Sequence, residues 1–174
     1  MKHALIAVLV LLGLAAPCHS EQADFTTDKP SPLQLIEPER VHVVSQFSGS
    51  VQLSGRFLVT WAAVDKETRH LQITFYPDAE SAALLPRMAR DRPVKELYFS
   101  NREDAAAMLL DVPTAQAIHA KELLTAKGEA IVTIRAYTVE VACDQRWYSA
   151  ELVSTDRSRH IVVGAHERGR VGCG

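Results

Sequence analysis

The residues best suited to recognising another molecule lie together in one short polar segment of the chain. Asp144, Arg146, Trp147 and Tyr148 combine charges of opposite sign with two aromatic rings. Tryptophan, tyrosine and arginine dominate the energetics of protein interfaces, so this group predicts a binding surface. The same residues can instead serve the fold, with the tryptophan packed over a disulfide at Cys143 and the aspartate paired with the arginine across a turn. The sequence favours this structural interpretation and keeps the binding surface as the alternative.

The histidines show no metal-binding pattern. Beyond residue 20 they are His42, His70, His119, His160 and His166. None of them is paired with another at the His-x-x-x-His spacing that holds zinc on one face of a helix. We therefore expect no metal ion and no other cofactor.

Motifs for covalent or acid–base catalysis are equally scarce. Gly49–Val51 lacks the remainder of a Gly-x-Ser-x-Gly nucleophile elbow. The acidic pairs Glu103–Asp104 and Glu140 with Asp144 could exchange protons with a substrate, but such carboxylates more often cap helices or lie on the surface. The sequence therefore favours a protein without catalytic activity, and an enzyme whose residues meet only in the fold is the alternative.

Composition predicts one globular domain and argues against a polyanionic partner. The 174 residues are 47% hydrophobic and 23% charged, which is ordinary for a single folded domain. The net charge is −2, and one unit lower without Lys2, so nucleic acid and anionic lipid are not expected partners. Arginine outnumbers lysine among the 19 basic residues, which hints at a GC-rich bacterial genome.

Residues 1–20 have the three-part pattern of a secretory signal peptide. A short basic start at Met1–His3 precedes an apolar run at Ala4–Leu14, and small residues follow at Ala15–Ser20. The apolar run is too short to span a bilayer, and we expect no transmembrane segment in the mature chain. The protein is therefore expected to be periplasmic or secreted.

The position of Cys18 is compatible with two kinds of signal, a cleaved secretory peptide and a lipoprotein signal. Cleavage before Glu21 places Cys18 and Ser20 at the −3 and −1 positions, where small residues are required. A lipoprotein signal, with Cys18 acylated and retained, is the alternative. That signal needs a small residue before the cysteine and a leucine-like residue three before it, where this chain has Pro17 and Ala15. The sequence therefore favours cleavage.

Two cysteines remain after the leader, and they predict a disulfide. Cys143 and Cys173 form an even pair in an oxidising compartment. Their bond would close a loop of about 30 residues and stabilise the fold by roughly 3 to 4 kcal/mol in the chain-entropy model. A redox-active pair is disfavoured because the Cys-x-x-Cys spacing is missing.

The first half of the mature chain predicts an arm followed by a hairpin. Residues 21–40 are rich in proline, which favours an extended arm. The arm's apolar residues that could dock on the domain are Leu33, Leu35 and Ile36. Val51–Ala63 and His70–Tyr76 alternate apolar and polar residues, as paired strands do, and Trp61 and Phe75 are the expected aromatic anchors. The other predicted elements here are a β-like start at Val41–Val44, a turn at Phe47–Ser50 and a charged turn at Asp65–Arg69.

Helical segments interrupt the strands in the middle of the chain. Asp78 is placed to cap a short helix that runs to Leu85, and Asn101 to cap a second one over Ala105–Leu110. Thr114–Leu124 is either a further helix or a loop.

Between the first two helices, Arg87–Pro93 predicts an exposed connection. Its arginines Arg87, Arg90 and Arg92 make a basic binding loop in the alternative interpretation. Val94–Ser100 then predicts a strand.

The longest strand-forming run, Gly128–Val153, predicts a central hairpin. Its apolar phase shifts near Arg135 and Ala136, which indicates a bulge or a sharp bend. A polar turn at Ser154–Arg159 and a short last strand at His160–Val163 are expected to follow.

Together these elements predict an α+β fold with a mainly antiparallel β-sheet or a small, partly open β-barrel, and with one or two short helices inserted between strands. A five-stranded barrel of the OB type, with helices between its third and fourth strands, fits the order of the elements. Three segments are expected: a signal peptide at 1–20, an N-terminal arm at 21–40 and one globular domain at 41–174.

Functions of different classes are compatible with this pattern. The favoured one is an exported, non-catalytic binding or accessory domain of the bacterial cell envelope, which engages an envelope protein or a glycan through the Asp144–Tyr148 corner and a sheet face. One alternative is a small secreted hydrolase whose site assembles only in the fold. Another is an inhibitor of a secreted enzyme that presents Arg87–Pro93 as its loop.

Overall fold

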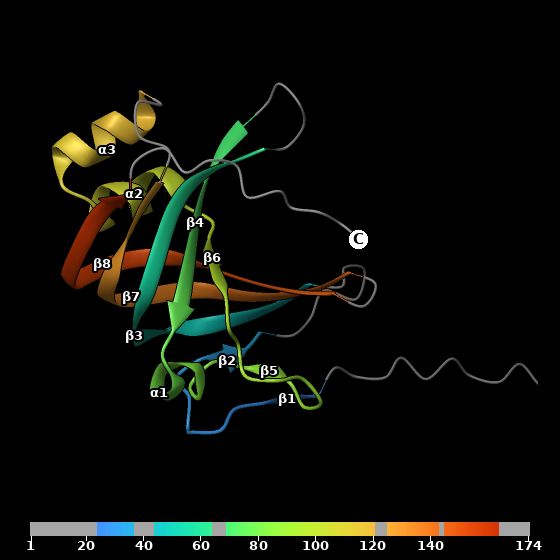
Figure 1. The fold of residues 1–174 in the computed structure, drawn as a ribbon. Helices are drawn as coiled ribbons and strands as arrows, with labels where there is room; N and C mark the ends of the chain where they lie inside the picture. Colours follow the sequence, from blue (N-terminus) through green and yellow to red (C-terminus); the bar gives the residue numbers. More distant parts are fainter. Residues whose placement is uncertain (1–23, 37–43, 64–68, 121–124, 143–144, 164–174) are drawn as a thin grey trace, which may run out of the picture.

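The computed structural model of the chain describes residues 24–36, 44–63, 69–120, 125–142 and 145–163 (Figure 1). The predicted signal peptide lies outside these ranges, and so do Cys143, Cys173 and Asp144 of the polar corner. His42 and His166 also lie outside them. The cleavage site and the disulfide therefore stay predictions.

Long strands make up most of the described fold, with three short helices among them. In chain order the elements are β1 (Phe25–Thr26), β2 (Gln34–Leu35), β3 (Val44–Ala63), β4 (Arg69–Pro77), α1 (Ala79–Ala82), β5 (Arg87–Met88), β6 (Leu97–Phe99), α2 (Arg102–Leu109), α3 (Val112–His119), β7 (Thr125–Ala142) and β8 (Gln145–Val163).

Five of these strands form a partly closed ring. The order around the ring is β3, β4, β6, β8 and β7, and β7 pairs again with β3. Every neighbouring pair is antiparallel except β6 with β8, which is parallel. The fold is therefore α+β with a mainly antiparallel, partly closed barrel, as the sequence predicted. In chain order, α2 and α3 lie between the third and fourth strands of the ring, β6 and β7, also as predicted.

The smaller elements cover the two ends of the ring. Figure 1 shows α2 and α3 at one end and α1 with β1 and β5 at the other. The described part of the arm belongs to this second end, because β1 pairs with β5 and β2 pairs with the beginning of β3. Leu33 is buried in the core, while Leu35 and Ile36 are exposed.

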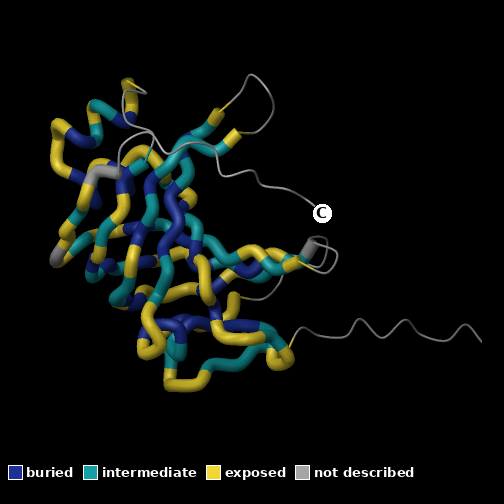
Figure 2. Tube along the Cα trace, viewed as in Figure 1, coloured by how far each residue is buried: buried dark blue, intermediate teal, exposed yellow. Residues whose placement is uncertain are grey.

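The core is one cluster of buried residues from the strands and helices, and Figure 2 shows buried residues along the strands of the ring. Two glycines make room for its aromatic rings. A Cβ atom on Gly55 would lie 2.8 Å from the ring of Phe75, and one on Gly128 would lie 2.7 Å from the ring of Phe57. Phe75 is fully buried, as expected for a core anchor, whereas Trp61 packs at the core edge and donates a hydrogen bond to the backbone oxygen of Ile118.

The predicted irregularity near Ala136 is confirmed. The pairing of β7 with β8 shifts register between Arg135 and Thr138, and Ala136 has a φ of 48°. On the other side of β7, the pairing with β3 shifts between Phe47 and Ser50, where Gly49 has a φ of 98°. The turn predicted at Phe47–Ser50 is wrong, because the bulge lets β3 continue through it.

The polar turn predicted at Ser154–Arg159 is also wrong, since β8 runs without interruption to Val163. Its hydroxyl groups find partners in the helix beside the strand. Thr155 donates a hydrogen bond of 2.9 Å to the backbone oxygen of Met108, and Ser158 donates one of 2.5 Å to that of Leu109. Carbonyl groups at the end of a helix lack intrahelical partners, so polar residues are favourable in this strand.

The connection predicted to be exposed at Arg87–Pro93 is partly buried. Arg87 belongs to β5 and is only 8% exposed. Its guanidinium group donates to Asp28 Oδ1 at 2.8 Å and to the backbone oxygen of Asp91 at 3.1 Å. The expectation failed because Asp28, a partner distant in sequence, compensates the buried charge. Arg90 and Arg92 are exposed.

Helices α1 and α2 follow the N-cap residues that the sequence indicated, Asp78 and Asn101, whereas α3 begins at Val112, two residues before the segment left undecided. The side chain of Asp78 caps α1 and that of Asp111 caps α3, so the ambiguous segment after Pro113 is helical through His119. Asn101 occupies the N-cap position of α2, but its side chain makes no capping hydrogen bond. In the described ranges, no helix has both the length and the apolar character needed to cross a membrane.

Candidate functional site

Tyr98 lies on the outer face of the barrel because its neighbours on β6 are core residues. Leu97 and Phe99 are buried, and side chains alternate between the two faces of a strand. Tyr98 is in register with Thr74 of β4 and with Ser149 of β8. The phenol ring therefore stands in the middle of a surface made by three strands.

Trp147 of β8 lies beside Tyr98 and is open to solvent. The two ring centroids are 6.0 Å apart, and the ring planes are inclined by 45°. Trp147 is 44% exposed, so it is not packed into the core as the structural interpretation of this corner expected. Its indole is free to contact another molecule.

Two adjoining hollows meet at this aromatic pair. Their volumes are about 380 and 470 Å³, and both are lined by Tyr98, Trp147 and Tyr148. We refer to the two hollows together as the aromatic groove. The first hollow is also lined by Pro93, Lys95, Glu96, Gln145 and Arg146. The polar residues that line the second are His70, Gln72, Ser100, Arg102, Glu140 and Ser149.

Arg146 is held at the wall of the aromatic groove by Asp91. The Nε atom of Arg146 lies 3.2 Å from Asp91 Oδ2, in an ion pair that lacks hydrogen-bond geometry. The backbone oxygen of Asp91 in turn accepts from the buried Arg87. The pairing of Arg146 with Asp144 that the sequence suggested concerns a residue outside the described ranges. The carboxylate described beside Arg146 comes instead from the segment after β5.

Tyr148 anchors the corner from the inside of the barrel. Its ring stacks on that of Tyr137, with centroids 6.4 Å apart and planes inclined by 16°. Tyr137 is fully buried and donates a hydrogen bond of 2.7 Å to the backbone oxygen of Pro86. Burial and the neighbouring carboxylate of Asp91 raise the pKa of the Tyr148 phenol. Tyr148 is half-buried, so only part of its ring reaches the groove.

The phenol group of Tyr98 stays neutral at ordinary pH. Burial, together with the hydrogen bond that it donates to Glu96 at 2.9 Å, raises the pKa of Tyr98 to about 12. A phenol that does not ionise offers a ligand a hydrogen-bonding group and an aromatic plane. It does not serve as a base.

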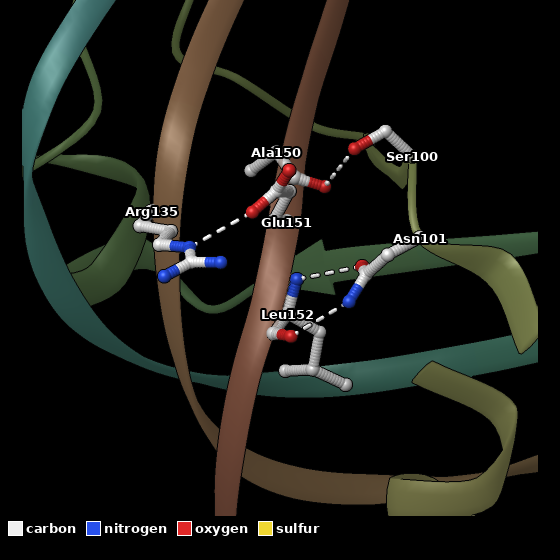
Figure 3. Close-up of polar contacts among 6 residues, drawn as sticks. All are labelled: Ser100, Asn101, Arg135, Ala150, Glu151 and Leu152. Carbon is white, nitrogen blue, oxygen red and sulfur yellow. Dashed lines mark hydrogen bonds and ion pairs between the residues drawn. The ribbon is translucent and has the colours of Figure 1, made fainter. Parts of the chain in front are cut away.

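Side chains just before α2 bind the backbone of β8, the strand that carries Trp147. The side chain of Asn101 accepts from the backbone nitrogen of Leu152 and donates to its oxygen, both at 2.9 Å (Figure 3). Ser100 donates a hydrogen bond of 3.2 Å to the backbone oxygen of Ala150. From the neighbouring strand, Arg135 binds Glu151 at 2.8 Å. The side chain expected to cap α2 therefore joins β6 to β8 instead.

Charges around the aromatic groove balance. The cations are Lys95, Arg102 and Arg146, and the carboxylates are Glu96, Glu140 and Asp91, the partner of Arg146. A polyanion would gain no net electrostatic attraction here. Within the ranges that the structure describes, no three His, Cys, Asp or Glu side chains are close enough together to hold a metal ion. The groove thus offers aromatic planes surrounded by hydrogen-bonding groups.

Sequence reasoning found one side of this groove and missed the other. It singled out Arg146, Trp147 and Tyr148, and the structure brings all three to the groove. It did not single out Tyr98, although the alternation in Val94–Ser100 puts that residue on the face opposite Leu97 and Phe99. The missing information was the pairing of β6 with β8, which is parallel and joins segments far apart in the chain.

Comparison with known proteins assigns no family to the chain. No family model matches it, and it matches no curated protein and no solved structure. Its function has to be inferred from its own residues.

Proposed function

We propose that the protein is an exported, non-catalytic binding domain of the bacterial cell envelope, and that its aromatic groove binds a neutral glycan. The observation that carries this proposal is the exposed indole of Trp147, held 6.0 Å from the ring of Tyr98 where two hollows meet. An exposed indole offers a large apolar face, and a partner that covers it gains hydrophobic free energy.

A sugar ring matches the chemistry of this surface. Its flat C–H faces pack well on an aromatic plane, and its hydroxyl groups need hydrogen-bonding partners around the rim. Trp147 and Tyr98 supply the planes. Around them, Gln72, Ser100 and Glu140 can donate to or accept from hydroxyl groups.

The balance of charge in the groove favours a neutral glycan over a nucleic acid, which other proteins also bind on aromatic rings. Proteins that stack nucleic-acid bases on aromatic rings also line their grooves with an excess of cations. Here the groove is balanced, and the chain as a whole carries a net charge of −2. A neutral glycan needs no such excess.

Fold-level analogy points to the same surface. In OB-type barrels, the face of the second and third strands binds oligosaccharides and oligonucleotides. The second and third strands of this ring are β4 and β6, which contribute Gln72 and Tyr98 to the aromatic groove. The analogy supports the location of the site, and the charge argument selects the glycan.

Tryptophan fluorescence gives a direct test, because the chain has only two tryptophans and Trp147 is the exposed one. Mature protein is titrated with neutral oligosaccharides, including oligomers of glucose, mannose and N-acetylglucosamine. We expect at least one of them to change the emission of Trp147 in a saturable way. The Trp147→Ala variant lacks the reporting indole, so its affinity is measured by titration calorimetry; it should bind at least tenfold more weakly, as expected for an aromatic anchor worth about 2 kcal/mol.

The matched control is Ile161→Ala, which removes another exposed apolar side chain from β8 at a distance from the groove. It should bind the oligosaccharide as the unmodified protein does. No saturable binding of any oligosaccharide would contradict the proposal, and an envelope protein covering Trp147 would then become the favoured partner. Release of new reducing ends during the titration would support the secreted hydrolase instead.

A further inference from the structure

The outer face of the barrel has a second hollow surface, formed by β3, β4, β7 and the end of β8. Two overlapping depressions of about 620 and 530 Å³ share Arg56, Tyr76, Glu129 and Arg159. We refer to them together as the cationic groove. Volumes of this size hold small organic molecules.

Strand register sets two parallel rows of side chains in this groove. Arg56, Glu129 and Arg159 are in register on β3, β7 and β8. The second row lies two residues further along each strand and consists of Leu58, Lys127 and Ile161. Positions two apart lie on the same face of a strand, roughly 7 Å from each other. A charged row therefore runs beside a row that is mainly apolar.

The cations of this groove have no carboxylate partners among the residues that the structure describes. Arg56, Lys127 and Arg159 are exposed, and none takes part in a described ion pair. Glu129 stands between the two arginines, and Asp78 also lines the first depression, so these two carboxylates offset two of the three positive charges. The groove keeps an excess of positive charge in a chain whose net charge is negative.

The apolar row is exposed as well. Ile161 is 62% exposed, and Leu58 and the ring of Tyr76 line the same hollow. Such residues favour a ligand with an apolar body over a bare inorganic ion.

We infer that the cationic groove is a binding site for a small organic anion, a carboxylate or phosphate monoester with an apolar or aromatic body. The anionic group lies above this row of side chains, within reach of Arg56 and Arg159, whose guanidinium forks suit carboxylate and phosphate oxygens. The body lies over Leu58 and Ile161. This site is separate from the aromatic groove and does not depend on the glycan proposal.

Phenyl phosphate is the probe, and benzamidine is its control, because benzamidine has a similar ring and the opposite charge. In amide NMR spectra of the mature protein, phenyl phosphate should shift signals of Arg56, Lys127 and Ile161 in a saturable way, and more strongly at low salt. Benzamidine should leave them in place. Inorganic phosphate should bind more weakly than phenyl phosphate, since it lacks the apolar body.

Three variants sharpen the test. Arg56→Gln with Arg159→Gln should weaken phenyl phosphate binding about tenfold or more, which corresponds to the loss of one charge-assisted contact. Glu129→Gln should strengthen it several-fold, because it removes the opposing charge without changing shape. The control Arg69→Gln removes an exposed arginine outside the groove and should change nothing.

The outcomes separate the possibilities. If Glu129→Gln weakens binding, or if benzamidine shifts the same signals as phenyl phosphate, the inference is overturned. Shifts confined to the aromatic groove would overturn it too. Trp147→Ala should leave phenyl phosphate binding unchanged, so the failure of this inference and that of the glycan proposal are distinguishable.

Discussion

Strand β8 contributes to both grooves, and its two ends present different chemistry. Near its start, Trp147 stands beside Tyr98 in a groove whose charges balance. Near its end, Arg159 and Ile161 line a groove with an excess of positive charge. The exposed residues Trp147, Arg159 and Ile161 occupy outward positions of this one strand. The inward positions of the same strand, such as Ala150 and Leu152, are buried in one common core. Recognition and folding therefore use alternate residues of the same segment.

High pH should produce the largest effect, through buried and half-buried tyrosines that include two of the aromatic groove. Burial raises the pKa of Tyr98 to about 12, places that of the buried Tyr137 well above its ordinary value, and raises that of Tyr148. In the unfolded chain these phenols ionise near pH 10. Their contribution to stability is complete below pH 10 and is lost as the pH rises through about 12. We expect the protein to unfold in this window, as measured by circular dichroism together with tyrosinate absorbance.

Tyr137→Phe is the control for this prediction, because it keeps the ring and removes the buried phenol. Despite the lost hydrogen bond to Pro86, the free energy of unfolding of this variant should fall less steeply with pH. Tyrosinate absorbance that develops near pH 10 with an unchanged circular dichroism spectrum would contradict the prediction.

Gly128→Val should destabilise the barrel beneath the cationic groove, which Gly128 lines. A Cβ at this position would lie 2.1 Å from the backbone oxygen of Arg159 and 2.7 Å from the ring of Phe57. We expect a loss of about 3 kcal/mol or more in the free energy of unfolding, because neither backbone nor packed ring can yield easily. Denaturant unfolding measures the loss. Thr133→Val places the same residue type on the same strand where a β-branched side chain already fits, and a comparable loss there would argue against the steric explanation.

Arg87→Ala should weaken ligand binding at the aromatic groove and leave binding at the cationic groove unchanged. Arg87 supports the aromatic groove alone, through Asp91 and its neighbour Arg146, and it also holds Asp28 of the arm. Removing this buried guanidinium should destabilise the fold by about 2 kcal/mol, less than for a fully buried pair because Asp28 is half-exposed. Binding at the aromatic groove should weaken, while phenyl phosphate binding stays the same. Equal weakening at both grooves would show that Arg87 acts only through global stability.

The sequence was sufficient to predict much of the barrel because alternation reports which side of a strand is buried. It placed Phe75 in the core, and it located the bulge near Ala136 from a change in apolar phase. It failed where partners distant in the chain override local character. The polar character of Ser158 predicted a turn, but the residue lies in a strand because the backbone oxygen of Leu109 accepts its hydrogen bond. The charge of Arg87 predicted exposure, but Asp28 pairs with it and the side chain is buried.

The candidate sites show the same limit more strongly. Composition at one corner was enough to single out Trp147, since exposed aromatic and charged residues gather there. Tyr98 could be placed on an outward face but not beside Trp147, because that contact depends on a parallel strand pair. The cationic groove needs three registers to be known together, and none of Arg56, Lys127 and Arg159 is unusual by itself.

The parallel pairing of β6 with β8 also has a consequence for the order of folding. It joins segments about fifty residues apart, and the hydrogen bonds of Ser100 and Asn101 to β8 span the same separation. Contacts this distant form late, because closing a long loop is entropically unfavourable until other structure is in place. The β3–β4 hairpin can form early from local contacts, but the pairing of Tyr98 with Trp147 has to wait for the last strand. A nascent or partly folded chain would therefore present neither complete groove, and ligand binding would report that the ring has closed.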